Sequence, residues 1–596
     1  MRVGEHRDDL SLRVRILLGV ALGALGLLAV AFWVVQGVHG ASYREQAENN
    51  RLRDVPIRAP RGLIYDRRER LLVENVPSYN LLLDRSRARD LSAAVRFAAE
   101  VLDRPPADIE RLLERYRSTP SFTPVLLAEG LSLAQVSRFG VASLDLPAFE
   151  IEIGHQRLYR QADHLAHVIG YLGEVSAEDL ATAKYRSGEL VGKKGLEQRY
   201  DDTLRGTDGR RVVVVDSRGR ALQEHEKQAA LPGKTLRLTI DLALQQAAER
   251  ALGDNVGAVV ALDPQNGEIL ALVSTPAYDP NAFTRRLSPE TWSGLLADSR
   301  HPLQNRTLQN TYSPGSVFKT IVAMAALTER VATPQTRVTC VGQTTVFGHP
   351  FRCWKKGGHG SVDLHAALRE SCDIWFYHAG AKLGIDAIAR YARLFGLGSP
   401  SGIDLLGEKL GLVPDEAWSQ RVRKHPWYPG ETVSVSIGQG PLLVTPVQMA
   451  VWVAAIANGG FKVTPHLVVD GAVAPPQRLP VDAAALEVVR QGLWAVVNEQ
   501  GTGQVVRLPG IEVAGKTATV QVVSQKTRTD SATLPYELRD HAWFASFAPA
   551  APGEKPRIAI VVFVEHGGGG SRAAAPVAKA MYETYFRDRL DRQRVL

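Results

Sequence analysis

The chain has 596 residues, which is too many for one hydrophobic core, so we expect two to four domains. Apolar residues make up 45% and charged residues 22% of the chain, as in an ordinary globular protein. The net charge of +8 suits an anionic partner. Because no zinc-finger, RNA-recognition or helix-turn-helix pattern accompanies this charge, we expect no nucleic-acid partner. An anionic membrane surface or a cell-wall polymer fits the charge as well.

The N-terminal segment predicts a membrane anchor. Residues 16–38 carry no charge and are long enough to cross a bilayer. Arg13 and Arg15 precede this run, so we expect residues 1–15 to stay in the cytoplasm and nearly everything after the run to lie outside it. A cleaved signal peptide is the alternative, but the run is long for one and residues 36–42 form only a fair cleavage site.

The segment from residue 39 to residue 232 predicts an elongated, partly β pedestal without a catalytic role. Apolar residues at 52, 55 and 57 indicate a strand, and strand patterns return near residues 149–153 and 212–215. The helical periodicity of residues 90–118 indicates a small head lobe inserted between these strands.

Residues 233–596 predict one larger domain, which gives the chain a mixed α+β fold class. Apolar runs at residues 257–262 and 268–273 flank an Asn-Gly pair, which is a hairpin signal. Helical patterns dominate the middle of this domain. Strand patterns and a final helix follow, at residues 511–523, 543–547, 558–564 and 573–585. Strands at both ends predict an antiparallel sheet whose members lie far apart in sequence.

The stretch from Thr311 to Thr320 is the strongest candidate for chemistry. Ser313 followed by proline reads as a helix start, with serine as the N-cap. Ser316 would then lie in the first turn, on the same helix face as Lys319 three residues later. A lysine of lowered pKa can take the proton of a serine hydroxyl, and the free N–H of Ser316 could steady an oxyanion. The pattern is common on solvated helices, but no other serine here has a lysine three residues later.

Two further stretches complete a known set. Ser371-Cys372-Asp373 begins an apolar run, and Lys516-Thr517-Ala518-Thr519 lies in a strand pattern. A Ser-x-x-Lys helix, a Ser-x-Asn-type turn and a Lys-Thr-Gly strand are shared by penicillin-binding proteins and class A β-lactamases. The chain resembles the class B penicillin-binding proteins, and most closely the penicillin-binding protein 2 group of elongation transpeptidases. Further matching motifs lie at residues 50–53, 61–67, 166–171, 195–200, 204–206, 261–278, 427–432, 436–440, 445–446 and 567–571.

The resemblance implies a fold and a set of roles. Residues 39–232 would be the dimerisation-type pedestal and residues 233–596 the transpeptidase domain. Ser316 would be acylated by the penultimate D-Ala of a stem peptide, with Lys319 as general base. Ser371 would relay a proton to the leaving amine, with Asp373 and Lys516 holding the network. Thr517 and Thr519 would line the strand that receives the peptide, and the N–H groups of Thr519 and Ser316 would form the oxyanion hole.

Two residues depart from the family pattern. Asp373 replaces the more usual asparagine and places a carboxylate near two lysines, which favours their charged forms. Ala518 stands where the family has glycine, and its methyl group would crowd the substrate or shift the backbone. We expect activity to survive this alanine. The glycine run at residues 567–570 lacks the context of a phosphate loop and predicts a tight turn near the cleft edge, with His566 in a structural role.

All three cysteines of the chain lie close to this site in sequence. From the residues alone two interpretations stay open: one disulfide with a stray thiol, or a closed Cys₃His zinc site made by Cys340, Cys353, His359 and Cys372. The resemblance favours zinc, because related transpeptidases carry a metal between these two catalytic stretches. Such a zinc would be structural, and no cofactor is expected for catalysis.

The resulting prediction is a single-pass inner-membrane D,D-transpeptidase with its catalytic domain in the periplasm. Its substrates would be peptidoglycan stem peptides, and β-lactams would inhibit it. By resemblance, its partners would be a polytopic glycosyltransferase of the shape, elongation, division and sporulation (SEDS) family and other elongation-complex proteins. The alternatives are a D,D-carboxypeptidase or β-lactamase that sends the acyl-enzyme to water, a β-lactam sensor, and a catalytically weak β-lactam-binding scaffold.

Overall fold

A computed structural model describes residues 5–44, 52–121, 123–182, 184–185, 189–215, 221–284, 289–522, 533–587 and 590–591. The chain forms two compact units. The first comprises Met1–Pro60, Pro77–His155 and Gly206–Gly233, and the second Arg61–Val76, Gln156–Arg205 and Lys234–Leu596. The sequence predicted a single boundary near residue 232. The unit that holds the C-terminal domain instead takes in two earlier segments as well.

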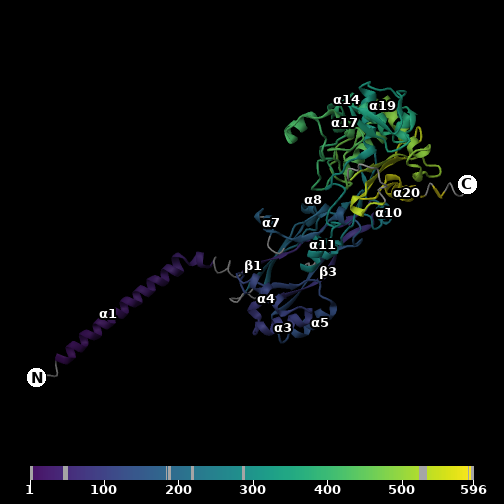
Figure 1. Cartoon of the computed structure of the whole chain (residues 1–596). Helices are drawn as coiled ribbons and strands as arrows, with labels where there is room; N and C mark the ends of the chain where they lie inside the picture. Colours follow the sequence, from purple (N-terminus) through teal and green to yellow (C-terminus); the bar gives the residue numbers. More distant parts are fainter. Residues whose placement is uncertain are drawn as a thin grey trace. The chain divides into compact units, whose positions relative to one another are not determined.

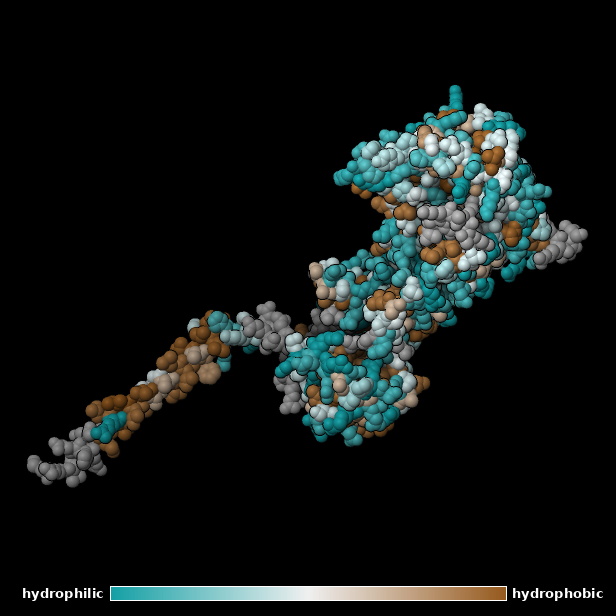
Figure 2. Space-filling view, viewed as in Figure 1, coloured by the Kyte–Doolittle hydropathy of each residue, from teal (hydrophilic) through white to brown (hydrophobic). Residues whose placement is uncertain are grey.

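The first unit begins with one long apolar helix. α1 (Glu5–Trp33) continues into a π-helical turn, η1 (Val34–Val38). Within the described residues, Leu10–Val38 is the one helical stretch long and apolar enough to cross a membrane. From Leu10 to Trp33 its side chains are exposed to solvent, and Figure 2 shows this helix as mostly hydrophobic, with hydrophilic atoms near its N-terminal end. An apolar surface of this kind is stable only in lipid or against a partner.

The first unit also contains a small sheet and a helical lobe. β1 (Leu52–Ile57), β8 (Gly209–Val215) and β9 (Ala221–Gln228) pair antiparallel. In the lobe the predicted helical segment divides into α3 (Leu91–Leu102) and α4 (Pro106–Arg115), because Asp103 ends α3 in a left-handed conformation and Pro106 starts α4. The remaining lobe elements are β4 (Val125–Ala128), α5 (Leu133–Ala142) and β5 (Phe149–Tyr159). The aromatic trio Phe97, Phe139 and Phe149 fills the lobe core.

The second unit contains a buried ion cluster beneath its catalytic part. Glu197 in α8 (Gly195–Arg199) is fully buried and accepts from Arg61 Nε at 2.6 Å and from Arg157 Nε at 2.8 Å. Arg61 also reaches Asp201 at 2.8 Å, in α9 (Asp201–Arg205). Arg61 and Glu197 are 136 residues apart in sequence, and Arg157 and Glu197 are 40 apart, so the cluster joins three separate segments. A charge buried this deeply is stable only when it is paired in this way.

The catalytic part of the second unit is built on a five-stranded antiparallel sheet in the order β12-β11-β21-β20-β19. The hairpin β11 (Gly257–Leu262) and β12 (Ile269–Thr275) turns at Gly267, whose φ of 88° requires glycine. The sheet is completed by β19 (Ala514–Val520), β20 (His541–Ala548) and β21 (Ile558–Val564). As the pattern predicted, the hairpin and the three late strands form one sheet from distant parts of the chain.

Helices cover both faces of this sheet. α10 (Leu242–Leu252) and α20 (Ala575–Tyr585) pack together on one face, as Figure 1 shows. The other face meets α12 (Lys319–Thr328) and α18 (Pro446–Ala457), whose side chains are buried nearly all round. Helices that are apolar on every side belong inside a large core. The core therefore holds the nucleophile segment rigidly against the sheet.

The remaining helices flank this core. α13 (Leu364–Arg369), α14 (Asp373–Leu383) and α15 (Ile385–Leu394) follow one another, and α17 (Pro429–Val435) packs against α14. α19 (Ala483–Asn498) was not predicted, although its apolar residues recur with helical spacing at 485, 489, 493 and 496. α19 packs against α13 and β19, so it supports two of the predicted catalytic stretches at once.

Candidate active site

The nucleophile segment begins differently from the prediction. Ser313 does not cap a helix with its side chain; a 3₁₀ turn, η4 (Gly315–Val317), comes first and α12 starts only at Lys319. The reason is Gly315, which has a φ of +54° that an α-helix cannot contain. Ser316 therefore sits in a tight turn, half-exposed, while Lys319 is fully buried at the helix start. That the hydroxyl of Ser316 and the amine of Lys319 share one face stays a prediction.

Glycines allow the backbone around this turn to approach its neighbours closely. The N–H of Gly315 donates to the carbonyl of Gly438 at 3.0 Å. A Cβ on Gly438 would lie 2.1 Å from the Gly315 carbonyl oxygen, so no other residue fits there. The segment that follows α17 is thereby fixed against the turn that carries Ser316.

Ser371 is held in a strained turn between α13 and α14. Its φ is +57°, in the left-handed region that costs a non-glycine residue about 1–2 kcal/mol. The N–H of Ser371 donates to the carbonyl of Leu368, and the N–H of Cys372 to that of Ala367, which together close α13 with a Schellman motif. Glycine usually takes this left-handed position. The serine at this position presents its hydroxyl to Lys319.

Lys319 is the centre of the polar network. Its Nζ donates to Asp373 Oδ1 at 2.6 Å, to the Ser371 carbonyl at 2.9 Å and to Ser371 Oγ at 3.2 Å. The ring of Phe376 lies 5.4 Å from the same ammonium group. An ammonium group has three N–H bonds, and these three acceptors match them. The three N–H bonds of Lys319 are therefore all directed at Ser371 and Asp373.

Asp373 also binds the backbone of residues 340–359, which carry Cys340, Cys353 and His359 and are called the cysteine-rich loop below. The N–H of Trp354 donates to Asp373 Oδ2 at 2.8 Å, and the indole of Trp354 donates to the Glu370 carbonyl at 3.0 Å. The N–H of Asp373 in turn points at Cys353 Sγ, 3.4 Å away. Sequence reasoning missed Trp354; its only signal is that it directly follows Cys353.

Lys516 is a buried amine on β19. Its side chain is fully buried, and burial together with the nearby charge of Lys319 lowers its pKa well below the usual value, while Asp373 opposes this shift. Its Nζ donates to the carbonyl of Thr517 at 3.1 Å. Of the two lysines in the site, Lys516 is the one that the surroundings favour in its neutral, proton-accepting form.

β19 offers an edge to a substrate peptide. Among the described strands β19 pairs only with β20, so its second edge has unpaired backbone groups. An extended peptide can add to such an edge as a further strand. Thr519 is exposed, whereas Thr517 is buried and its Oγ1 contacts Thr502 Oγ1 at 2.6 Å. Thr502, between two glycines, was not identified from the sequence.

Ala518 faces the nucleophile turn and not the substrate edge. It is buried, and its Cβ would lie 3.1 Å from a Cβ built on Gly315. The glycine at 315 therefore leaves the room that the methyl group of Ala518 takes. Gly570 packs against the same residue, because a Cβ there would lie 2.7 Å from the Ala518 carbonyl oxygen. The position of this methyl group therefore indicates contact with the nucleophile turn and not the expected crowding of the substrate.

The four predicted metal ligands come together beside the site. The ligand atoms of Cys340, Cys353, His359 and Cys372 all lie within 4.8 Å of one another, and the three thiols are buried and not joined in a disulfide. His359 Nδ1 lies 3.4 Å from Cys340 Sγ and 3.5 Å from Cys353 Sγ. The contact with Cys372 lowers the pKa of the Cys353 thiol, and the same contact raises that of Cys372. Four ligands of this kind fit a tetrahedral zinc ion, whose Zn–S bonds of ~2.3 Å place sulfurs roughly 3.8 Å apart.

Comparisons with known proteins agree with this architecture. The family model described as "Penicillin binding protein transpeptidase domain" matches residues 257–583, and "Penicillin-binding Protein dimerisation domain" matches residues 56–238. The "Peptidoglycan D,D-transpeptidase MrdA" of Haemophilus influenzae is 36% identical, over 98% of this chain and 94% of its own. The protein of the same name from Escherichia coli K12 is 33% identical, over 95% and 93%.

Solved structures give the same result. Penicillin-binding protein 2 from Helicobacter pylori, in a complex with MreC, superposes with a TM-score of 0.81 at 29% identity, over 90% of this chain and 99% of its own. A chain from a peptidoglycan synthase complex superposes with a TM-score of 0.72 at 33% identity, over 96% and 98%. The chain therefore belongs to the class B penicillin-binding proteins, in the penicillin-binding protein 2 group.

The contact between Gly315 and Ala518 predicts an asymmetry between two substitutions. Ala518→Gly removes one buried methyl group, so we expect a loss of about 1 kcal/mol in stability and an acylation rate within about threefold of the wild type. Gly315→Ala places a Cβ 2.9 Å from Val520 Cγ2 at a φ of +54°, so we expect the rate to fall about 100-fold or more. Stopped-flow penicillin acylation measures both. Gly553→Ala is the control, because Gly553 also has positive φ but no atom near its Cβ position. Equal rates for the two site variants would contradict this account.

We expect the buried amine of Lys516 to lower the stability of the fold while it is needed for acylation. Lys516→Met keeps the length of the side chain and removes the buried amine, so the thermal midpoint should rise by an amount equivalent to roughly 1 kcal/mol at neutral pH, while penicillin acylation is lost.

The same lysine predicts a pH dependence. Between the lowered folded pKa and the unfolded value of 10.5, the unfolded chain binds a proton that the folded chain does not. Wild-type stability should therefore rise with pH over this interval, and the methionine variant should lack that part of the slope. Thermal unfolding of both proteins in one buffer series is the measurement. Parallel curves would show that Lys516 has an ordinary pKa.

Proposed function

We propose that this chain is the peptidoglycan D,D-transpeptidase of cell elongation, acting through an acyl-enzyme on Ser316. The observation that carries the proposal is the buried network in which Lys319 meets Ser371 and Asp373 one turn away from Ser316. A buried lysine, a strained second serine and an open strand edge are the parts that serine acyl transfer to an amine needs.

The two steps follow from this arrangement. A stem peptide adds along the free edge of β19, which brings the carbonyl of its penultimate D-Ala to Ser316. Lys319 acts here as a neutral amine: it takes the hydroxyl proton of Ser316 while the Ser316 oxygen bonds to the carbonyl carbon. The tetrahedral intermediate then expels the terminal D-Ala, whose nitrogen receives that proton from Lys319 through the hydroxyl of Ser371. The amine of a second stem peptide then attacks the ester, forms the crosslink and releases Ser316, which regains its proton. Asp373 and Lys516 hold the network through both steps.

The alternatives use the same acyl-enzyme with a different acceptor. A carboxypeptidase or β-lactamase must activate water, and the groups around Ser316 that the structure describes are two lysines, a serine and one carboxylate already bound to Lys319 and Trp354. The arrangement favours an amine acceptor over hydrolysis. It also argues against an inactive scaffold, because every polar member of the network is present and paired.

We also propose a position for the chain in the cell, supported by the apolar helix α1. We place residues 1–15 in the cytoplasm because Arg13 and Arg15 stand at that end of the apolar helix, and we place the catalytic unit in the periplasm. The related Helicobacter protein is titled as a complex with MreC, and another neighbour belongs to a peptidoglycan synthase complex. These support elongation-complex partners for this chain, among which we propose a polytopic SEDS-family glycosyltransferase.

We also propose that the cysteine cluster binds one structural zinc ion. Cys340, Cys353, His359 and Cys372 would supply a closed set of four ligands, and zinc would supply only cross-linking of the loop to the turn before α14. The zinc ion would steady the active site by two routes. Cys353 precedes Trp354, whose N–H binds Asp373, and Cys372 directly follows Ser371.

Labelling with a fluorescent penicillin tests the central proposal. We expect one stable adduct per chain on the peptide that contains Ser316, identified by mass spectrometry, and none in Ser316→Ala. Ser313→Ala is the matched control and should label normally, because Ser313 contributes only its carbonyl to Trp543. A label that disappears within minutes would favour a β-lactamase, and an adduct at another serine would refute the proposal.

Metal analysis of tag-free protein tests the zinc proposal. We expect about one zinc per chain, lost in His359→Ala together with a tenfold or larger fall in the acylation rate, because the support of Asp373 and Ser371 is loosened. His378→Ala is the control, since His378 lies close by and contacts Thr344 outside the cluster. A Cys353–Cys372 disulfide without metal would end the proposal.

A further inference from the structure

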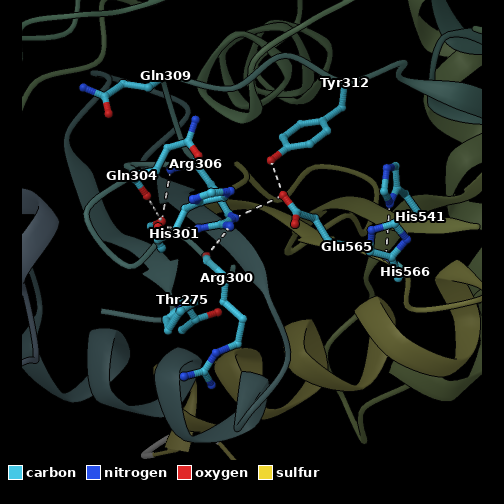
Figure 3. Close-up of polar contacts among 12 residues, drawn as sticks. Thr275, Arg300, His301, Gln304, Arg306, Gln309, Tyr312, His541, Glu565 and His566 are labelled. Carbon is cyan, nitrogen blue, oxygen red and sulfur yellow. Dashed lines mark hydrogen bonds and ion pairs between the residues drawn. The ribbon is translucent and has the colours of Figure 1, made fainter. Parts of the chain in front are cut away.

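A second, largely buried polar cluster is centred on Glu565. Tyr312, four residues before the nucleophile, donates its hydroxyl to Glu565 Oε1 at 2.6 Å. Arg306 Nε donates to the same oxygen at 3.0 Å. Figure 3 shows Tyr312 and Arg306 pointing at Glu565 from two different segments. The Arg306 side chain is 2% exposed and that of Glu565 16%, so the cluster is largely withdrawn from water. Neither the sequence motifs nor the proposed mechanism uses these residues.

Each member of the cluster is anchored on its own side. Arg306 donates from its two terminal nitrogens to the carbonyls of Arg300 and His301, at 2.6 and 3.3 Å. Tyr312 exchanges both backbone hydrogen bonds with Val444 and stacks its ring on Phe563, with centroids 3.9 Å apart. Burial and the neighbouring carboxylate raise the pKa of Tyr312, so its hydroxyl keeps the proton that it donates. A short hydrogen bond to a carboxylate of this kind is about twice as strong as a neutral one.

Glu565 lies where the two halves of the acylation site meet. On one side, the chain runs from Tyr312 through Ser313, whose carbonyl accepts from Trp543 Nε1 at 3.1 Å, to Ser316. On the other side, Glu565 is followed by His566, whose N–H donates to His541 Nδ1 at 3.0 Å. The glycines after His566 then reach β19, where Gly570 fits tightly over Ala518, the residue before Thr519.

We propose that Glu565 is a positioning residue that sets the distance between Ser316 and the β19 edge. The hydrogen bond from Tyr312 fixes the nucleophile segment, the glycine turn fixes the strand, and Glu565 joins the two. Loss of this bond leaves the site folded but lets the nucleophile drift relative to the bound carbonyl. Misplacement by a fraction of an ångström at a reacting centre slows the chemical step far more than it weakens binding.

The chain contains a matched control for this interaction. Tyr391 donates its hydroxyl to Glu329 Oε1 at 2.9 Å, and Arg390 pairs with the same oxygen at 2.7 Å. This second tyrosine–glutamate–arginine cluster sits at the far end of α12, where Glu329 is the C-cap. It repeats the donor and acceptor types of the first cluster at a more exposed place, where the side chains of Arg390 and Glu329 are 56% and 38% exposed.

The test compares penicillin acylation in full-length, detergent-solubilised variants. For Tyr312→Phe we expect about a tenfold fall in the acylation rate constant, an unchanged pre-acylation dissociation constant and a thermal midpoint close to that of Tyr391→Phe, which should acylate at the wild-type rate. Phenylalanine keeps the stacking on Phe563, so the hydroxyl alone is removed. Equal rates for the two phenylalanine variants would overturn the proposal.

A double-mutant cycle separates positioning from general destabilisation. Glu565→Gln keeps an oxygen that accepts from Tyr312 but removes the charge that strengthens the bond, so it should slow acylation by no more than Tyr312→Phe does. The double variant should be no slower than Tyr312→Phe alone, since without the hydroxyl the charge has no bond to strengthen. Effects that multiply would show that the residues act independently and would overturn the proposal. The inference rests on acylation of Ser316; an unlabelled wild type would defeat the proposed function itself, whereas a labelled wild type with unaffected variants defeats only the role of Glu565.

Discussion

The buried ion pair between Lys319 and Asp373 is the interaction on which the site depends. It joins the start of α12 to the start of α14, and the Lys319 side chain is fully buried while that of Asp373 is 10% exposed. Withdrawing two charges from water costs several kcal/mol each, and Coulomb attraction compensates only when the remaining donors and acceptors are also satisfied. Here Ser371 accepts twice from Lys319, and the Trp354 N–H occupies the second oxygen of Asp373. The pair is therefore stable only with the Ser371 turn and the cysteine-rich loop in place.

This requirement explains why the site stands on rigid elements. Ser371 keeps an unfavourable φ because its carbonyl and hydroxyl both bind the ammonium group of Lys319. Gly315 and Gly438 bring two backbones into contact, so the nucleophile turn cannot shift without breaking the fold around it. β19 stays open along one edge, which leaves the substrate peptide as the element that completes the sheet. Oriented acyl transfer needs a rigid nucleophile and a rigid polar network, next to an open strand edge that can bind the substrate.

The sequence predicted the parts that depend on local pattern. Strand and helix periodicity placed β11, β21 and α20 within a residue or two, and the three catalytic stretches came from their residue spacing and the resemblance. The sequence could not predict that Gly315 delays the start of the α-helix, because the same residues from Ser313 to Ser316 are compatible with an α-helical first turn and with a 3₁₀ turn. It also could not show that Ala518 points at Gly315, because the face of a strand residue depends on the register with β20. The division into two interleaved units could not be predicted either, because it depends on non-local contacts. The ion pairs of Glu197, for example, connect segments that no local pattern links.

Two supports hold the nucleophile and its network from opposite sides, and both are non-local. The cysteine cluster reaches Asp373 through the backbone of Trp354, and Glu565 reaches Ser316 through Tyr312. Side chains that contact substrate can be found from a motif, because the chemistry restricts the residue type. Side chains that only fix a distance can be found from geometry alone, since a carboxylate that accepts from a tyrosine is common everywhere, as Glu329 at the other end of α12 demonstrates. What distinguishes Glu565 is its place in the chain, between the strand that ends at Val564 and the glycines that cover Ala518, so that one hydrogen bond constrains both partners of the acylation step.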